Sequence, residues 1–176
     1  MADADQAQDP LPAGPGSALL TLSDAAATRA LGRRLARRLL PACRPGQAPL
    51  LLLHGDLGAG KTCLVQGLAE ELGIDEPITS PTFALAQHYR GHRGDGDATA
   101  LVHLDLYRLE DGAAADELFA QEEEEALVLG ALLAVEWPGR LSHVPAGAWE
   151  LRLSLAEEED PDAGRLAWLT PPASGI

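Results

Sequence analysis

Short, uninterrupted apolar runs alternate along the chain with segments in which apolar residues return every three or four positions. Residues 50–53 and 131–135 are continuous apolar runs, and each leads directly into a polar residue, His54 and Glu136 respectively. Runs of this length are typical of strands that are buried on both faces of a sheet. The alternation of such runs with helical segments predicts an α/β fold with a mostly parallel central sheet.

Helical spacing predicts three helices around these strands. The first begins at Ser23 or Asp24, either of which is a good N-cap, and ends before Pro41. The second follows a glycine-rich segment and ends at Gly73, where the glycine suits a helix C-terminus. The third spans the Ala- and Glu-rich residues 110–128. We therefore expect the sheet to be flanked by helices.

The remaining strand-like segments pair up as hairpins. Residues 82–89 and 99–107 flank a loop rich in glycine and aspartate, and residues 149–155 and 165–170 flank an acidic loop. Hairpins add antiparallel strands, so the complete pattern predicts a mixed sheet.

One domain is expected to occupy residues 19–176. Residues 1–18 are acidic and rich in proline, glycine and alanine, a composition that predicts a disordered leader. They have neither the basic start nor the apolar core of a signal peptide, and no run approaches the ~20 apolar residues of a membrane span. We therefore expect a soluble, cytoplasmic protein that has no membrane partner.

The net charge of the chain indicates which kinds of partner it can bind directly. The chain has 13 Lys and Arg residues against 27 Asp and Glu residues, a formal net charge of −14. Such a surface disfavours direct binding to the phosphates of nucleic acids. The glutamate run at 122–125 and the arginine cluster at 33–38 are each predicted to form a solvated helix face, with a phosphate or acidic partner as the alternative for the arginines.

The glycine-rich segment between the first apolar run and the second helix carries the strongest chemical signal. Residues 55–62, Gly-Asp-Leu-Gly-Ala-Gly-Lys-Thr, fit the pattern GxxxxGK[ST] in full. Glycines let backbone N–H groups turn toward phosphate oxygens, and the helix N-terminus adds partial positive charge. Lys61, the one lysine in the sequence, would reach the terminal phosphates, and the Thr62 hydroxyl would hold Mg²⁺. The sequence therefore predicts a single P-loop NTPase domain. Its expected nucleotide-binding residues are Asp56, Leu57, Gly58, Ala59, Gly60, Lys61, Thr62 and Cys63.

A P-loop enzyme also needs a carboxylate at the end of a neighbouring strand, where it holds the metal shell or orients the attacking water. Glu136 ends one apolar run, and Asp105 ends the apolar-rich segment 100–104. Spacing alone does not decide which of them contacts the metal, and a surface carboxylate at a strand end is the alternative for each. His103 shares a strand face with Asp105 and is predicted to be a buried structural histidine.

Three classes of P-loop protein compete at this point. A GTPase is disfavoured because the NKxD-type motif that reads guanine needs an asparagine, and the sequence contains none. A small-molecule kinase would normally carry an arginine-bearing lid near its C-terminus, where this chain has only the scattered arginines Arg140, Arg152 and Arg165. A regulatory or assembly ATPase needs neither feature. That class is preferred, and a small-molecule P-loop kinase is the alternative.

Four motifs indicate which family of regulatory or assembly ATPases the sequence resembles. They are GDLGAGKT at 55–62, SPTF at 80–83, HLDLYRL at 103–109 and EWP at 136–138. In this order and spacing they resemble the TsaE (YjeE) family of bacterial ATPases, which serve the formation of N6-threonylcarbamoyladenosine (t6A) in tRNA. The resemblance covers roughly residues 20–170.

The resemblance implies a protein that binds and hydrolyses ATP with Mg²⁺ and acts with the TsaB and TsaD proteins. In that family, TsaD modifies adenosine 37 of tRNAs that read codons beginning with adenine, and the ATPase supports multiple turnovers of the complex. The tRNA would therefore meet this chain only through its partners. Turnover by the isolated chain is expected to be slow, because the motifs contain no obvious arginine finger and Arg108 is the nearest candidate.

Residue roles follow from the resemblance by matching motifs position by position. The implied site residues are Lys61 and Asp105 for catalysis, Thr62 and Glu136 for the metal, Thr28 for the nucleotide, and Ser80, Pro81 and Thr82 for a switch-like segment near the γ-phosphate. Trp137 is expected near the nucleotide or the partner surface, with a place in the core as the alternative.

Overall fold

The computed structural model describes residue 11 and residues 16–173. Within these residues, seven strands form one sheet in the order β1-β7-β6-β2-β5-β4-β3. The strands are β1 (Ala18–Leu22), β2 (Leu50–His54), β3 (Ala86–His92), β4 (Ala98–Asp105), β5 (Leu132–Glu136), β6 (Trp149–Glu157) and β7 (Asp160–Thr170). Parallel pairing joins β6, β2, β5 and β4, whereas β1, β7 and β3 are joined antiparallel. The sheet is therefore mixed with a parallel centre, as the sequence predicts.

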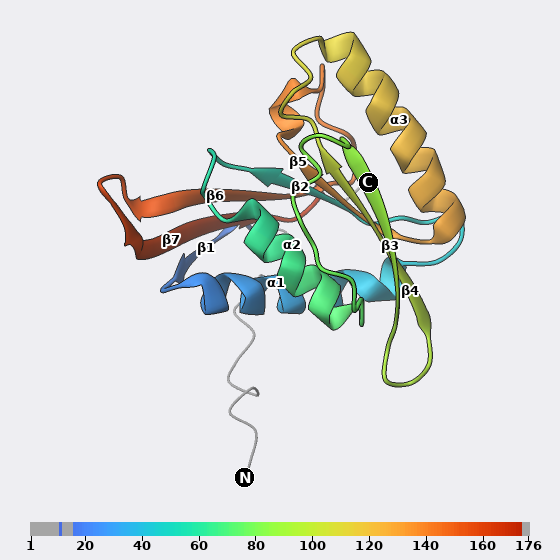
Figure 1. Cartoon of the computed structure of the whole chain (residues 1–176), viewed down its shortest axis with the longest axis horizontal. Helices are drawn as coiled ribbons and strands as arrows, with labels where there is room; N and C mark the ends of the chain where they lie inside the picture. The colour runs from blue at the N-terminus through green and yellow to red at the C-terminus, as the bar shows by residue number, and fades with distance from the viewer. Residues whose placement is uncertain (1–10, 12–15, 174–176) are drawn as a thin grey trace.

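Helices cover both faces of the sheet. The helices are α1 (Ala25–Leu39), α2 (Lys61–Glu71) and α3 (Gly112–Leu129), with short 3-10 helices at Leu40–Ala42 and Pro138–Arg140. Figure 1 shows α1 and α2 side by side on one face and α3 across the other. Because β2 and β5 lie between these layers, their apolar residues are buried on both sides. None of the helices in the described residues combines the length and apolar character needed to cross a membrane.

Close packing of α1 on α2 brings the two helix backbones into contact at two glycines. A Cβ atom at Gly67 would lie 2.1 Å from the carbonyl oxygen of Arg29, and one at Gly32 would lie 2.2 Å from that of Leu64. Neither position has room for a side chain, so glycine lets the two helix backbones touch. This contact holds α1 next to the amino end of α2.

The arginine cluster of α1 is largely engaged with α2. Arg33 Nη1 lies 2.7 Å from Glu70 Oε2, and Arg37 Nε lies 3.2 Å from Glu71 Oε2. These pairs are on the surface, where ion pairs contribute little stability. Arg37 and Arg38 are exposed, as predicted for a solvated helix face, whereas Arg33 and Arg34 are half-buried.

Some predicted boundaries are wrong. The strand predicted at 82–89 begins only at Ala86, because residues 82–84 form a turn in which the N–H of Leu85 donates to the carbonyl of Pro81 (2.6 Å). Leu85 itself has a φ of 67°, which a strand does not allow. The turn keeps the SPTF segment outside the sheet.

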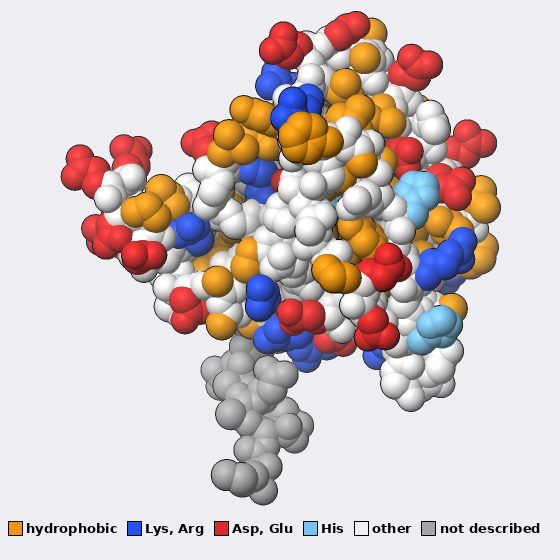
Figure 2. Space-filling view, in the orientation of Figure 1, with side chains coloured by type: hydrophobic (Ala, Val, Ile, Leu, Met, Phe, Trp, Pro, Cys, Tyr) orange, Lys and Arg blue, Asp and Glu red, His pale blue; other side chains and the backbone are white. Residues whose placement is uncertain are grey.

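The predictions for two acidic segments are also wrong in part. Glu122 is buried rather than solvated, because α3 turns it toward His88 of β3, whose Nε2 lies 2.5 Å from Glu122 Oε2. The acidic loop predicted between 156 and 164 is largely strand, since β6 extends to Glu157 and β7 begins at Asp160. Figure 2 shows the resulting acidic hairpin tip projecting from one side of the molecule.

The first strand was not predicted at all. β1 pairs with β7 at the edge of the sheet, and its exposed and buried residues alternate. The predicted leader, residues 1–18, lies largely outside the described residues. Of its members, Leu11 is buried and Ala18 begins β1.

Candidate functional site

The glycine-rich loop joins the carboxyl end of β2 to the first residue of α2, Lys61. The Lys61 side chain is 5% exposed, and its Nζ donates to the backbone carbonyls of Gly55 (2.5 Å) and Asp56 (2.9 Å). Burial lowers the pKa of Lys61, and the nearby carboxylates of Glu136, Asp105 and Asp56 oppose that effect. The only lysine of the chain therefore sits inside the loop, surrounded by acceptors.

The Trp137 ring lies against the Lys61 ammonium group. The Lys61 Nζ lies 4.6 Å from the centre of the Trp137 ring, a cation–π distance, and Tyr107 packs against the same ring at 4.9 Å. The Trp137 backbone has a φ of 59°, an unusual value for a large side chain. Trp137 is half-buried: it lies beside the loop and also packs against the hydrophobic core on that face of the sheet.

Glu136 stands at the end of β5 and takes two hydrogen bonds on one oxygen. Thr62 Oγ1 donates to Glu136 Oε1 (3.1 Å), and His103 Nε2 lies 2.9 Å from the same oxygen. His103 is fully buried, as predicted, and its Nδ1 is buried with no partner among the described residues. His103 therefore holds the Glu136 carboxylate toward Thr62.

Asp105 lies directly across from Glu136, because β4 and β5 are parallel and the two residues are in register. Its Oδ2 accepts hydrogen bonds from Ser80 Oγ (2.9 Å) and Thr82 Oγ1 (3.0 Å), and its Oδ1 accepts from the Tyr107 N–H (2.9 Å). Asp105 is 2% exposed. The turn that contains the SPTF segment is thus anchored on Asp105.

A cavity of about 350 Å³ lies where these groups meet. Its lining includes Lys61, Thr62, Ser80, Thr82, Asp105 and Glu136. Arg108 is not among the described lining residues; its guanidinium lies 4.2 Å from the centre of the exposed Phe83 ring. The structure thus brings together the residues expected for catalysis and for the metal with two of the three expected for the switch, Ser80 and Thr82. Pro81 is not among the lining residues, and the candidate arginine finger lies outside the cavity.

A smaller cavity of about 230 Å³ lies beside Gly60, between α1 and the β6–β7 hairpin. Thr28 and Cys63 line it. The Thr28 hydroxyl donates to the carbonyl of Asp24 (3.2 Å), so its methyl group faces the loop. Arg165 lines the same cavity and contacts the loop directly. No motif marks Arg165, which sequence reasoning treated as one of several scattered arginines.

The oxygen atoms around the larger cavity match the preferences of one class of metal. Thr62 supplies a hydroxyl, and Glu136 and Asp105 supply carboxylates, the hard donors that Mg²⁺ prefers. The described residues contain no cluster of three His, Cys, Asp or Glu that would hold a metal by itself. An ion here would need further oxygens, such as those of phosphate and water.

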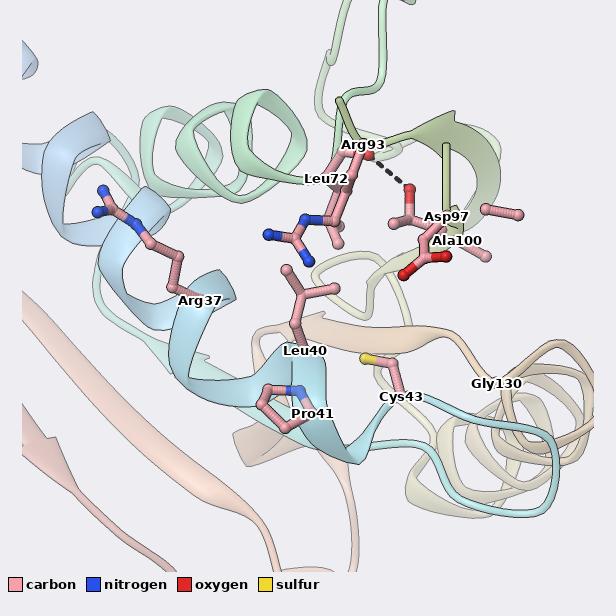
Figure 3. Close-up of a pocket in the computed structure, with 11 residues that line it drawn as sticks. Arg37, Leu40, Pro41, Cys43, Leu72, Arg93, Asp97, Ala100 and Gly130 are labelled. Atoms are coloured by element: carbon pink, nitrogen blue, oxygen red, sulfur yellow. Dashed lines mark hydrogen bonds between the residues drawn. The ribbon is translucent and has the colours of Figure 1, made fainter. Parts of the chain in front are cut away.

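The largest of these cavities, about 400 Å³, lies beside the amino ends of β4 and β5. We call this end of the parallel strands the opposite edge, because the glycine-rich loop lies at their carboxyl ends. Figure 3 shows Cys43, Leu40 and Arg93 around it. Burial raises the pKa of the Cys43 thiol to about 11, so the thiol is protonated near neutral pH. Cys43 therefore gives this cavity no ready nucleophile.

The chain is similar to proteins of one family. Residues 22–165 match the family described as "Threonylcarbamoyl adenosine biosynthesis protein TsaE". A protein of Streptomyces coelicolor named tRNA threonylcarbamoyladenosine biosynthesis protein TsaE is 39% identical, over 81% of this chain and 88% of its own. Proteins of the same name from Synechocystis and Nostoc are 42% and 39% identical, over 71% and 69% of this chain and 73% and 70% of their own.

Proposed function

Because this chain belongs to the TsaE family, we propose that it is the ATP-binding and ATP-hydrolysing accessory subunit of the system that forms t6A in tRNA. The family name places its relatives in t6A biosynthesis. The proposal adds the chemistry: binding of ATP at the glycine-rich loop and its hydrolysis in the cavity of about 350 Å³. It also includes a cytoplasmic location, where tRNA is modified.

One observation carries the proposal: four buried or half-buried polar side chains from three separate elements meet behind the glycine-rich loop. Lys61 and Thr62 begin α2, Asp105 ends β4, and Glu136 ends β5. Burying charged groups is costly unless they serve each other or a ligand. A triphosphate with its metal supplies the charges and oxygens that this arrangement accommodates.

Each residue then has a distinct proposed role. Lys61 would exchange its two backbone carbonyl partners for the oxygens of the terminal phosphates. Thr62 and Glu136 would hold Mg²⁺, which would neutralise charge on the phosphates. Asp105 would orient the attacking water, and would have to release hydroxyl partners in order to do so.

That release gives a physical reason for dependence on a partner. In this structure the hydroxyls of Ser80 and Thr82 both donate hydrogen bonds to Asp105 Oδ2, so this oxygen is occupied. A partner that repositions the SPTF turn would free Asp105, so the isolated chain would be slow and the complex faster. Repositioning the turn would also move Phe83, and with it the Arg108 guanidinium.

The proposed partners are the TsaB and TsaD proteins, with tRNA reached only through them. A net charge of −14 supports this division of labour, because an acidic chain gains little from phosphate contacts. Direct tRNA affinity of the isolated chain should therefore be weak even at low salt. Tight tRNA binding by the chain alone would contradict this part of the proposal.

The test is ATP hydrolysis by the purified chain, alone and with the TsaB and TsaD proteins of its host, with Lys61→Ala as the blank. We expect slow turnover alone and faster turnover in the mixture, both absent in the variant. Equal rates with and without partners would refute partner dependence. Transfer of phosphate to a small acceptor would favour the alternative, a small-molecule P-loop kinase.

A further inference from the structure

Arg165 is bonded to the glycine-rich loop from a distant part of the chain. Its Nε donates to the carbonyl of Ala59 (3.2 Å), and its Nη2 donates to the carbonyl of Gly58 (3.1 Å). Its Nη1 donates to the carbonyls of Pro161 (2.6 Å) and Gly164 (3.0 Å), within its own hairpin. One guanidinium therefore joins four backbone carbonyls, two in the loop and two in the β6–β7 hairpin.

The base of this side chain is held firmly. Arg165 lies within β7, where its backbone is in register with Leu22 of β1 on one side and with Leu155 of β6 on the other. A backbone paired on both sides moves little. The guanidinium can therefore transmit the position of the sheet to the glycine-rich loop.

The bonds to Gly58 and Ala59 also set the direction of backbone N–H groups. In a trans peptide the carbonyl and the next N–H point in opposite directions. Holding the Ala59 carbonyl toward Arg165 thus turns the Gly60 N–H to the other side of the loop. Inward-pointing N–H groups are what a glycine-rich loop needs to bind phosphate.

We propose that Arg165 is a positioning residue for nucleotide binding: it braces the glycine-rich loop against the β6–β7 hairpin in its phosphate-binding conformation. The inference rests on the proposed function, since it assumes that the loop binds ATP. The planar fork of the guanidinium is essential, because a lysine ammonium at the same place would not span both loop carbonyls and both hairpin carbonyls.

The test compares two substitutions at Arg165 with one control. Arg165→Lys keeps the charge but not the fork, and Arg165→Gln keeps a donor but not the charge. Arg90→Lys changes an exposed arginine in β3, at the far edge of the sheet, and is the control. Affinity for a non-hydrolysable ATP analogue with Mg²⁺ is measured for all four proteins, together with thermal unfolding.

We expect both Arg165 variants to lose about tenfold or more in affinity, and Arg90→Lys to match the wild type. Full affinity in both Arg165 variants would overturn the inference alone. Loss in Arg165→Gln with full retention in Arg165→Lys would also overturn it, because charge and not the brace would then matter. No binding by the wild type would overturn the proposed function itself.

Hydrogen exchange without nucleotide gives a second, independent readout. Amides of residues 56–60 should exchange about tenfold faster in Arg165→Lys than in the wild type, while those of β2 and β5 stay unchanged. Unchanged exchange at 56–60 would mean that Arg165 acts by touching the nucleotide, and would contradict the brace. Should both variants fail to fold, the wild type decides: its 56–60 amides must exchange more slowly than those of the 93–97 hairpin loop.

Discussion

The two ends of the parallel strands each carry a cavity, and the two cavities differ in what is buried around them. At the carboxyl ends, the cavity of about 350 Å³ borders the buried side chains of Lys61, Asp105 and Glu136. At the amino ends, the cavity of about 400 Å³ is larger, but its charged members, Arg37, Arg93 and Asp97, are all exposed. Volume alone would favour the second cavity.

The difference shows that buried polarity, and not size, distinguishes a chemical site here. A buried charge that is not needed is costly and is easily replaced by an apolar residue of similar volume. Exposed arginines at the opposite edge carry no such cost, and their ion pairs add little. The carboxyl ends of the parallel strands, called the carboxyl edge below, therefore carry buried charged side chains whose presence the fold alone does not explain.

Removing the buried lysine should produce the largest difference between the two cavities. Lys61→Ala should lower ATP affinity by about 100-fold or more, because it removes the charged donor that we propose binds the terminal phosphates. Isothermal titration measures the change. Arg93→Ala at the opposite cavity is the matched control and should bind as the wild type does. Similar losses in both variants would remove the distinction between the two edges.

A second variant separates binding from turnover at the carboxyl edge. Asp105→Asn keeps the size of the side chain but removes the charge that we propose orients the attacking water. We expect hydrolysis with partners to fall about 100-fold and ATP affinity to stay within about threefold. Asp97→Asn, at the opposite cavity, should change neither quantity. If Asp105→Asn instead loses affinity and turnover equally, Asp105 is a structural residue.

A glycine at the opposite edge tests whether that region serves stability only. Gly130 has a φ of 63°, and a Cβ atom there would lie 2.5 Å from the carbonyl carbon of Arg44. Gly130→Ala should therefore lower the free energy of unfolding by about 2 kcal/mol, as measured by urea denaturation. Gly94→Ala, where no atom lies within 4 Å, is the control. At temperatures where Gly130→Ala is folded, a change in ATP affinity would contradict a purely structural role.

The smallest expected effect is a pH dependence near the glycine-rich loop. Burial lowers the pKa of His54, with Arg152 adding to that effect and Glu150 opposing it. The unfolded chain would take up a proton near the ordinary pKa of 6.5, while the folded protein resists it. His54 therefore contributes stability above about pH 6.5, and that contribution is lost as the pH falls.

His54→Gln should accordingly show a shallower loss of stability between about pH 6.5 and pH 5 than the wild type, in urea denaturation at each pH. His92→Gln, at an exposed histidine in β3, is the control substitution. Identical slopes in the wild type and His54→Gln would show that His54 does not titrate differently in the two states.

Local patterns made much of the fold predictable. The continuous runs that became β2 and β5 need no long-range information, since burial on both faces imposes an apolar sequence. Asp24 caps α1 as its type suggests, accepting from the N–H of Ala27. The grouping of the site residues was predictable for a related reason: motifs at the ends of parallel strands meet at one edge of a sheet.

What could not be predicted depends on contacts made far along the chain. β1 is a strand because β7 lies beside it, about 145 residues later, and its short sequence gives no strong signal of its own. Glu122 is buried because His88 faces it from another element. Arg165 reaches the loop only in the folded protein, so spacing could not distinguish it from other arginines. The roles of the site residues stay predictions until variants are measured.

The most direct test of the central claim, that the carboxyl edge binds ATP together with Mg²⁺, is the Mg²⁺ dependence of ATP-analogue affinity in the wild type and in Glu136→Gln. We predict that Mg²⁺ strengthens binding in the wild type and strengthens it much less in the variant, because we propose that Glu136 and Thr62 share the metal. Affinity that is indifferent to Mg²⁺ in the wild type, or equally sensitive in both proteins, would contradict the claim.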